Sequence, residues 1–400
     1  MEYRKLTPAG LLSPGTGAPE VAEAAWQVCW NEVADAAGTV LGALPDALEF
    51  HTSGSTGPSR CWRRTREDAW REAGMLAEFV RRDAPEAVVS FAPPVHVYGA
   101  LATLLLPARL GVPVWYRPGY IGGLPETGVR RAVVVATPWI FSLLLRHMDW
   151  VRSLDHVTVL YSSAMLPSDA AVFLREAGPG RAAVVELLGS TETGGVAVRR
   201  WSGGEPPAWT LFPDVEFAGE TGSGDTGSGD TGSGDTGSGD TGSGDTGSGG
   251  DAAGTAVPLV IRSPRLAHLP GEPAPREWST GDLVEPVDAR TFRLLGRTGR
   301  LVKINGQRIN LDEAEHTLRA RLDCADLALV PVNDPMIGEH VDLYLVPRAG
   351  ERPAGAELAA VRAVLGARPR KTHVVPALSR SAMGKLQHLT TSHSPTGIPT

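Results

Sequence analysis

The chain has 400 residues, of which 42% are hydrophobic and 21% charged, a composition typical of a soluble globular protein with a core large enough for two domains. Its net charge of −7 at pH 7 argues against a general nucleic-acid-binding protein. No run approaches the roughly 18 apolar residues of a membrane span, so we expect no membrane and no nucleic-acid partner.

The run His51-Thr-Ser-Gly-Ser-Thr-Gly-Pro-Ser-Arg60 follows a short apolar segment, 47–50, that predicts a strand. Its glycines permit a tight turn that brings backbone N–H groups close to an anion, its hydroxyls add donors, and Arg60 adds a fixed positive charge. Thr65 and Asp68 form a capping box that predicts a helix next. Strand, glycine-rich loop and helix together predict a phosphate cradle. A flexible Ser/Gly surface loop is the alternative that this run alone leaves open.

Four apolar, β-branched runs follow, at 87–91, 132–136, 156–160 and 183–187, with helical patterns near 138–148 and 167–177 between them. This alternation predicts a parallel sheet covered by helices on both faces. Such sheets bind ligands at the carboxyl ends of their strands. We therefore expect the phosphate loop, Ser162-Ser163 and Gly189–Glu192 at one edge of the sheet.

Residues 221–250 are of low complexity, because TGSGD repeats five times and no apolar residue occurs there. We predict a disordered loop inserted between strands at 215–217 and 257–261. Calcium binding is the less favoured alternative, because calcium-binding β-roll repeats have nine residues and an apolar position. Beyond Phe292, a helix at 311–322, strands at 327–332 and 341–346, and a helix at 357–365 predict a small α+β unit. The end, 390–400, is predicted to be a frayed tail.

The three cysteines, Cys29, Cys61 and Cys324, lie too far apart in the sequence for a CxxC or short Cys/His zinc motif. Their odd number and wide spacing favour a reducing compartment. The N-terminal Met-Glu-Tyr-Arg-Lys is not followed by an apolar signal core. We therefore expect a cytoplasmic protein.

Four further motifs follow the loop in order: Gly189-Ser-Thr-Glu-Thr-Gly194, Trp278-Ser-Thr-Gly-Asp282, the run from Gly296 to Arg308, and Arg380-Ser-Ala-Met-Gly-Lys385. Each alone is compatible with an ordinary turn or a solvated surface. In this order, from His51 to Lys385, they resemble the acyl-adenylate-forming (AMP-binding) superfamily, which includes acyl- and aryl-CoA synthetases, nonribosomal peptide synthetase adenylation domains and luciferase. The runs HVYG and STETGGVA look closest to short stand-alone members found beside polyketide-type and aryl-polyene pathways.

The resemblance implies an ATP- and Mg²⁺-dependent reaction in which a carboxylate attacks the α-phosphate of ATP. The thiol of coenzyme A, or of a carrier protein's phosphopantetheine acting in trans, then displaces AMP from the acyl-adenylate. By this resemblance Lys385 bridges the carboxylate and the α-phosphate, Thr191 contacts the α-phosphate and Glu192 binds Mg²⁺. Asp282 and Arg297 hold the ribose. The other expected nucleotide contacts are Thr52, Ser53, Gly54, Ser55, Thr56, Gly57, Arg60, Ser163, Leu188, Gly189 and Lys303.

The resemblance also implies an α/β fold with a large N-terminal domain, 1–296, whose mostly parallel sheets are covered by helices. A small, mobile α+β domain, 297–400, would carry Lys385. Arg297–Arg300 corresponds to the hinge about which this domain turns between the two half-reactions, with Gly299 at the hinge position. The turn would bring the Gly306 loop to the path of the thiol.

The chain departs from the family pattern at several positions. Arg60 replaces a lysine, Ser59 a proline and Leu188 an aromatic residue, and only 51 residues precede Thr52. These departures leave a degenerate nucleotide-binding protein without activity as an alternative. An enzyme is favoured because the chain retains residues to which the resemblance assigns chemistry or nucleotide contacts: Glu192, Asp282, Arg297 and Lys385.

The segment 91–99 matches the entry to the family's acyl pocket. The stretch from Ala92 to Leu106 contains no acidic residue that could pair with an α-ammonium, so an α-amino acid is disfavoured. Val97 follows His96 where activators of dihydroxybenzoate have asparagine, so a salicylate-like acid is disfavoured as well. His96 is expected either to gate or floor the pocket or to be a buried structural histidine. An apolar aryl, unsaturated or fatty acid remains, and an amine acceptor or a non-carboxylate oxyanion is the alternative chemistry.

Overall fold

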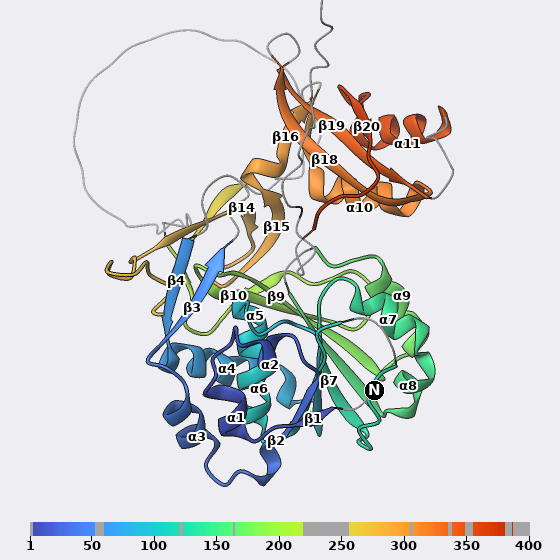
Figure 1. The fold of residues 1–400 in the computed structure, drawn as a ribbon. Coiled ribbons are helices and arrows are strands. Elements are labelled where there is room, and N and C mark those ends of the chain that lie inside the picture. Colours follow the sequence, from blue (N-terminus) through green and yellow to red (C-terminus); the bar gives the residue numbers. More distant parts are fainter. Residues whose placement is uncertain are drawn as a thin grey trace, which may run out of the picture.

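The structure is a computed structural model that describes residues 3–52, 60–119, 123–162, 165–218, 256–304, 307–334, 338–348, 355–380 and 386. Within these ranges the N-terminal body contains a large mixed sheet (Figure 1). Its strands are β1 (Arg4–Lys5), β2 (Trp26–Cys29), β5 (Ala87–Ser90), β6 (Pro113–Tyr116), β7 (Arg131–Ala136), β8 (His156–Tyr161), β9 (Ala182–Ser190), β10 (Gly194–Trp201), β11 (Trp209–Leu211), β12 (Glu216–Phe217), β13 (Val257–Arg262), β14 (Trp278–Pro286) and β15 (Thr291–Arg297). They lie side by side in the order β1-β2-β6-β5-β7-β8-β9-β10-β11-β15-β14-β13-β12.

The centre of this sheet is parallel, as the apolar runs predict. β5 pairs in parallel with β6 and β7, β7 with β8, and β8 with β9. From β9 onward through β10, β11, β15, β14, β13 and β12 the neighbours are antiparallel. The sheet is therefore mixed, with the predicted parallel strands at its core.

Helices cover both faces of the parallel strands (Figure 1). Successive residues of β7 enter opposite cores: Val133 belongs to the core that includes residues of α1, α3, α4 and α6, and Val134 to the core that includes residues of α7, α8 and α9. This alternation follows from the period of two along a strand. The helices are α1 (Pro8–Leu12), α2 (Pro19–Ala22), α3 (Ala36–Ala43), α4 (Arg66–Arg81), α5 (Val97–Gly99), α6 (Leu106–Leu110), α7 (Ile140–Arg146), α8 (Met148–Ser153) and α9 (Asp169–Ala177), with a short 3₁₀ turn η1 (Trp30–Glu32) and a buried π-helical segment η2 (Ala100–Leu105).

The predicted order of strand, glycine-rich loop and helix is wrong in its last element, because a second strand follows the loop before the helix begins. Residues 53–59, which lie outside the described residues, connect two antiparallel strands, β3 (Ala47–Thr52) and β4 (Arg60–Thr65), in a hairpin separate from the large sheet. Phe50 of β3 and Trp62 of β4 lie opposite each other and are both buried, so the chain after the loop is again an extended strand with one buried face. The N-cap of the predicted capping box is confirmed one strand later, because the Thr65 hydroxyl accepts from the Asp68 N–H at the start of α4. The Asp68 carboxylate accepts from the same hydroxyl (2.7 Å) in place of the reciprocal bond to a backbone N–H.

The repeat 221–250, its predicted disorder and the calcium alternative lie outside the described residues, as does the tail 390–400. The predicted strands on either side of the repeat are confirmed, since β12 and β13 pair antiparallel, with Phe217 opposite Ile261. Among the described helices, none combines the length and apolar character that crossing a bilayer requires.

The C-terminal part has a hydrophobic core of its own, built around residues such as Leu311, Leu329 and Leu343. The predicted helices and strands are present here, with somewhat longer strands. The 3₁₀ turn η3 (Thr298–Arg300) leads from β15 into this part (orange to red in Figure 1). Its elements are β16 (Leu301–Ile304), β17 (Gln307–Asn310), α10 (Leu311–Arg321), β18 (Cys324–Asp334), β19 (Gly338–Pro347), α11 (Gly355–Leu365) and β20 (Thr372–Val374). The boundary between 296 and 297 stays a prediction.

Candidate active site

A cavity of about 170 Å³ lies between the end of β3, the segment that begins at His96 and the turn between β9 and β10. Several predicted site residues line it, although their motifs are far apart in the sequence: Thr52, His96, Leu188, Gly189 and Thr191. Ser162 directly follows the parallel strand β8, and Gly189 lies near the end of β9, so both are at the carboxyl edge of the sheet, as expected. Thr52 reaches the same cavity from the separate hairpin.

The turn between β9 and β10 is held by its own hydrogen bonds. The Ser190 N–H donates to the Thr193 hydroxyl over 3.1 Å, and the Thr193 hydroxyl donates to the Gly194 carbonyl over 2.8 Å. Thr193 is buried, whereas Thr191 and Glu192 are half-buried at the top of the turn. The turn thus keeps one hydroxyl for structure and leaves one hydroxyl and one carboxylate accessible.

Two glycines of this motif are required by close approach. A Cβ on Gly189 would lie 2.2 Å from the carbonyl oxygen of Gly194 on the facing strand. A Cβ on Gly194, whose φ is +67°, would lie 2.3 Å from Nη1 of Arg64. The glycines of the motif therefore permit the hairpin to close and to pack against an arginine.

Behind the turn lies a buried charged network that the sequence analysis missed. Glu72 of α4 accepts from Arg64 (2.5 Å) and Arg265 (2.6 Å) through Oε2, and from the Gly195 N–H (2.6 Å) through Oε1. Arg265 also donates to the Gly195 carbonyl (3.0 Å) and pairs with Asp214 (2.7 Å). Glu72, Arg64 and Arg265 are each at most 2% exposed. Burial opposes ionisation of Glu72, but the two guanidinium groups outweigh it and lower the pKa of the carboxyl.

Asp282 and Arg297 face each other on β14 and β15, as the resemblance implies for a shared task. They are register partners, and Arg297 Nε lies 3.3 Å from Asp282 Oδ1. Asp282 is 4% exposed, whereas about half of the Arg297 side chain is open to solvent. Burial raises the pKa of the Asp282 carboxyl, despite the opposing effect of Arg297. The pair therefore presents a sheltered acceptor beside an accessible donor.

The segment after β5 is tied to the ends of the parallel strands by a tyrosine. The buried Tyr98 hydroxyl lies 2.6 Å from the Leu160 carbonyl and 3.2 Å from that of Ala136. Burial raises the pKa of this phenol, so it stays a neutral donor. The neighbouring His96 is half-buried and lines the cavity, which favours the pocket position over the fully buried structural alternative.

The remaining predicted residues are not gathered around the cavity. Among the described residues, Arg60 is exposed opposite Thr52, and Lys303 is exposed on β16, where its N–H donates to Glu339. Glu192, Asp282 and Arg297 are likewise not part of the cavity wall. Several predicted residues lie outside the described residues: Ser53, Gly54, Ser55, Thr56, Gly57, Ser163, Gly306 and Lys385.

The missed network leaves a faint signal in the sequence. Ala69, Ala73 and Leu76 form the buried stripe of α4, and Glu72 falls within it. Arg64 likewise follows the buried Trp62 at a spacing of two on β4. Charged residues at positions of a buried pattern are rare unless they are paired. The pattern could therefore have indicated a buried pair, although not its partner Arg265.

Residues 46–217 match the sequence model of the family described as AMP-binding enzyme. A medium/long-chain-fatty-acid–CoA/3-oxocholest-4-en-26-oate–CoA ligase of Mycolicibacterium smegmatis is 35% identical over 108 residues, which are 26% of this chain and 20% of that protein. A 4-coumarate–CoA ligase of Cereibacter sphaeroides is 29% identical over 178 residues, which are 42% of this chain and 41% of that protein. The matched segments thus span between about a fifth and two fifths of these curated relatives.

Solved structures share the fold over most of the chain. The anthranilate CoA ligase AuaEII, in complex with anthranoyl-AMP, superposes with a TM-score of 0.60 at 16% identity, covering 86% of this chain and 66% of that one. ATP-bound MatB from Rhodopseudomonas palustris superposes with a TM-score of 0.60 at 19% identity, covering 85% and 66%. The family match and the relatives confirm the resemblance that the ordered motifs carry: residues 46–217 belong to the AMP-binding enzymes of the acyl-adenylate-forming superfamily. The solved structures show the same α/β fold over most of the chain.

Proposed function

We propose that this protein is an ATP-dependent acid–thiol ligase that activates a carboxylic acid as its acyl-adenylate and transfers the acyl group to coenzyme A or to a carrier protein. The observation that carries the proposal is that Thr52, His96 and Thr191, which come from three separate motifs, line the same cavity. The curated relatives that match are named as CoA ligases and peptide synthetases, which supports the same chemistry.

In this proposal each element has a separate task at the nucleotide. Residues 52–60 bind the β- and γ-phosphates, with Arg60 offsetting part of their charge, and Thr191 donates to the α-phosphate. Asp282 accepts from a ribose hydroxyl while Arg297 orients the Asp282 carboxylate. Lys385 approaches with the C-terminal domain, 297–400, and places a positive charge where the carboxylate and the α-phosphate meet. The domain then turns about Arg297–Arg300, so that thioester formation occurs without Lys385.

Glu192 fits a role as a ligand of Mg²⁺. It is a half-buried carboxylate at the top of a turn, and its backbone is held by the bond from Ala267 N–H to the Glu192 carbonyl (2.8 Å). Mg²⁺ is usually bound by one or two carboxylates together with substrate phosphates and water, which requires such an accessible side chain. When bound, the ion would neutralise charge on the phosphates.

The cavity supports an apolar acid as the substrate. Leucine and valine side chains such as Leu76, Val97 and Leu101 form much of its wall. The carboxylate in that wall, Glu72, is already engaged by two guanidinium groups and a backbone N–H, so it offers no counter-charge to an α-ammonium.

The test is carboxylate-dependent exchange of pyrophosphate into ATP, run with a panel of benzoic, cinnamic, unsaturated and fatty acids. Exchange with at least one apolar acid is expected, and thioester formation should follow on adding coenzyme A or a phosphopantetheinylated carrier protein. Nucleotide binding without exchange for any acid would contradict the proposal and favour a degenerate nucleotide-binding protein. An amide product in the presence of amines, with no thioester, would assign the alternative acceptor.

Lys385→Ala tests the assigned division between the half-reactions. Adenylation should fall by about 10²–10³-fold, the usual effect of removing one electrostatic contact from a transition state. Thioester formation from preformed acyl-adenylate should be unchanged, because Lys385 leaves the site before that step. Lys371→Ala, an exposed lysine in the same C-terminal part, is the matched control and should leave both steps unchanged. Equal loss in both steps for Lys385→Ala would contradict the assigned role.

A further inference from the structure

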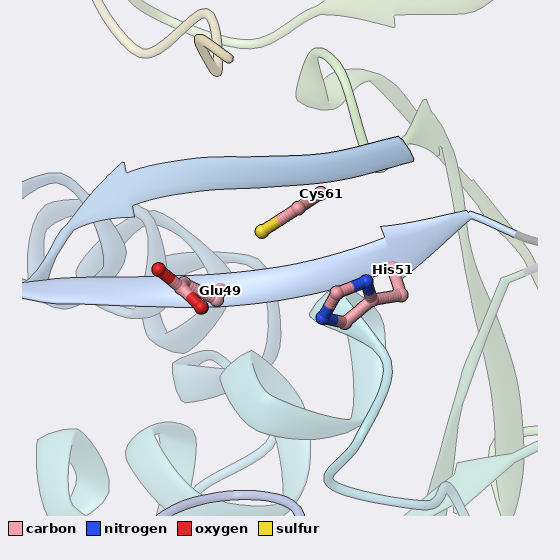
Figure 2. Close-up of side chains that lie close together, drawn as sticks. All are labelled: Glu49, His51 and Cys61. Carbon is pink, nitrogen blue, oxygen red and sulfur yellow. The ribbon is translucent and has the colours of Figure 1, made fainter. Parts of the chain in front are cut away.

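The hairpin β3–β4 gathers three potential metal ligands on one side (Figure 2). Glu49, His51 and Cys61 each offer one ligand atom, and these atoms all lie within 4.8 Å of one another. His51 and Cys61 are directly opposite each other in the hairpin register, and Glu49 lies two residues before His51 on the same face of β3. The antiparallel pairing thus brings together side chains that are ten positions apart in the sequence, a spacing at which no short zinc motif is recognisable.

The carboxylate of this cluster is already oriented by a neighbour. Arg63 contacts Glu49 through Nε at 2.8 Å and Nη2 at 2.6 Å, and both contacts are made to Oε1. Arg63 is itself held at the edge of the hairpin, because its N–H and carbonyl pair with the backbone of His268 over 2.8 and 3.1 Å. Metal-binding carboxylates commonly have such an outer partner, which fixes the ligand and leaves the second oxygen for the ion.

We propose that Glu49, His51 and Cys61 bind one Zn²⁺ ion at a site separate from the Mg²⁺ that serves ATP. A thiolate and an imidazole suit Zn²⁺ and disfavour Mg²⁺, whose preferred ligands are oxygens. Three protein ligands leave the fourth tetrahedral position open to water. Glu49 and His51 are exposed and Cys61 is half-buried, so an ion reaches the cluster from solvent without opening the core.

The charge balance of the site favours a divalent ion. Binding displaces the proton of the Cys61 thiol to solvent, and the thiolate and the Glu49 carboxylate then neutralise the two charges of Zn²⁺. The resulting neutral complex does not repel the adjacent Arg63 guanidinium. The ion would link the two strands next to Thr52 and Arg60, where the hairpin leads into the phosphate loop.

The test uses the full chain, reduced and freed of metal with a chelator, and Co²⁺ as the spectroscopic probe for Zn²⁺. One equivalent of Co²⁺ should bind with a thiolate-to-cobalt charge-transfer band, and Zn²⁺ should displace it. Calorimetry of Zn²⁺ binding in buffers of different ionisation enthalpy should report release of a proton. Absence of the band in the wild-type chain at millimolar Co²⁺ would overturn the proposal.

Variants assign the ligands. Cys61→Ser should abolish the band, whereas Cys29→Ser, which removes a half-buried cysteine outside the cluster, should keep it. His51→Asn and Glu49→Gln should weaken Zn²⁺ binding by more than the about 10–100-fold that loss of an outer partner costs. Each variant's thermal unfolding in chelator should match that of the wild type, which separates ligand loss from misfolding. A band that persists in Cys61→Ser would overturn the proposal, and none of these readouts depends on ligase activity.

Discussion

Removing the carboxylate of Glu72 should destabilise the protein more than any exposed charge change on the same helix. Glu72 is the carboxylate that contacts Arg64 among the described residues, and Arg64 is 2% exposed. Arg265 would keep Asp214 as a partner. Arg64 would lose its counter-charge, and two of its nitrogens already have no hydrogen-bond acceptor within the part of the chain that the structure describes. Glu72→Ala therefore leaves a buried guanidinium uncompensated.

The magnitude follows from that uncompensated charge. Removing one partner of a buried ion pair costs about 3–5 kcal/mol, and the lost bond from the Gly195 N–H is part of the same loss rather than an addition to it. A typical domain has a free energy of unfolding of about 5–15 kcal/mol, so Glu72→Ala should remove about a fifth or more of it. Glu72→Gln keeps an acceptor for Gly195 but not the charge, and should fall between Glu72→Ala and the wild type.

The effect of Glu72 should depend on pH with a definite sign. Its pKa in the folded protein is lowered, from about 4.3 in an unfolded chain, so its stabilisation is fully present above that pH. It is lost as the pH falls through the folded-state pKa. The difference in free energy of unfolding between the wild type and Glu72→Gln should therefore be constant near neutral pH and shrink below about pH 4.

Denaturant unfolding measures these changes, and pyrophosphate exchange well below the melting temperature measures their effect on the site. Because Gly195 follows the turn that bears Thr191, a displacement of about 1 Å there should lower exchange by about 10²-fold even in folded protein. The control is Glu78→Gln on the same helix, whose exposed pair with Arg81 (3.1 Å) should contribute less than about 1 kcal/mol. A Glu72→Ala variant within about 1 kcal/mol of the wild type would refute the reasoning.

Three other changes have defined outcomes. Burial raises the pKa of Asp282 above its unfolded value of about 3.9, so the ionised carboxylate costs stability as the pH rises through the folded-state pKa. Asp282→Asn should therefore melt at an equal or higher temperature than the wild type at pH 8, and this gain should vanish below about pH 3.9. A lower melting temperature of Asp282→Asn at pH 8 would contradict this. Tyr98→Phe removes the donor to two buried carbonyls and should cost about 1–3 kcal/mol in denaturant unfolding, whereas an unchanged midpoint would argue against those bonds. Gly189→Ala, whose Cβ would lie 2.2 Å from a facing carbonyl, should cost about 1–3 kcal/mol. Gly42→Ala, in the last turn of α3 where a Cβ meets nothing within 4 Å, should gain about 0.5–1 kcal/mol, so equal effects at the two glycines would count against the close approach.

The centre of the fold could be predicted because its signal is local. Runs such as 132–136 are apolar on both faces, and this pattern is typical of a parallel strand between two helical layers. The family resemblance could be recognised from the order of the motifs, because each motif is a short, contiguous stretch of the sequence. The second strand of the hairpin, β4, was missed for a physical reason. Its two buried residues are Trp62 and Arg64, and because one of them is charged, the strand does not alternate between apolar and polar residues.

Arg64 is buried only because Glu72 and the Gly195 region surround it, and Arg265 comes from 193 positions beyond Glu72. No local pattern reports a contact at that separation. The same is true of Asp282 and Arg297, whose pairing depends on the register of β14 and β15 and was expected from the family resemblance alone. The cavity likewise depends on how far β3 extends toward the β9–β10 turn, which composition does not encode.

The network also bears on Arg60, the most conspicuous departure from the family pattern. Arg64 lies four residues after Arg60 on the same strand, and Gly195 lies three residues after Glu192. Glu72 contacts Arg64 over 2.5 Å and the Gly195 N–H over 2.6 Å. Through these buried contacts it joins the β3–β4 hairpin to the turn that carries Thr191 and Glu192. In the proposed function these two elements meet one triphosphate, and the network fixes them relative to each other before any ligand binds, which lowers the cost of ordering them. A guanidinium at position 60 then needs only to supply charge, because the position of its strand is set from behind.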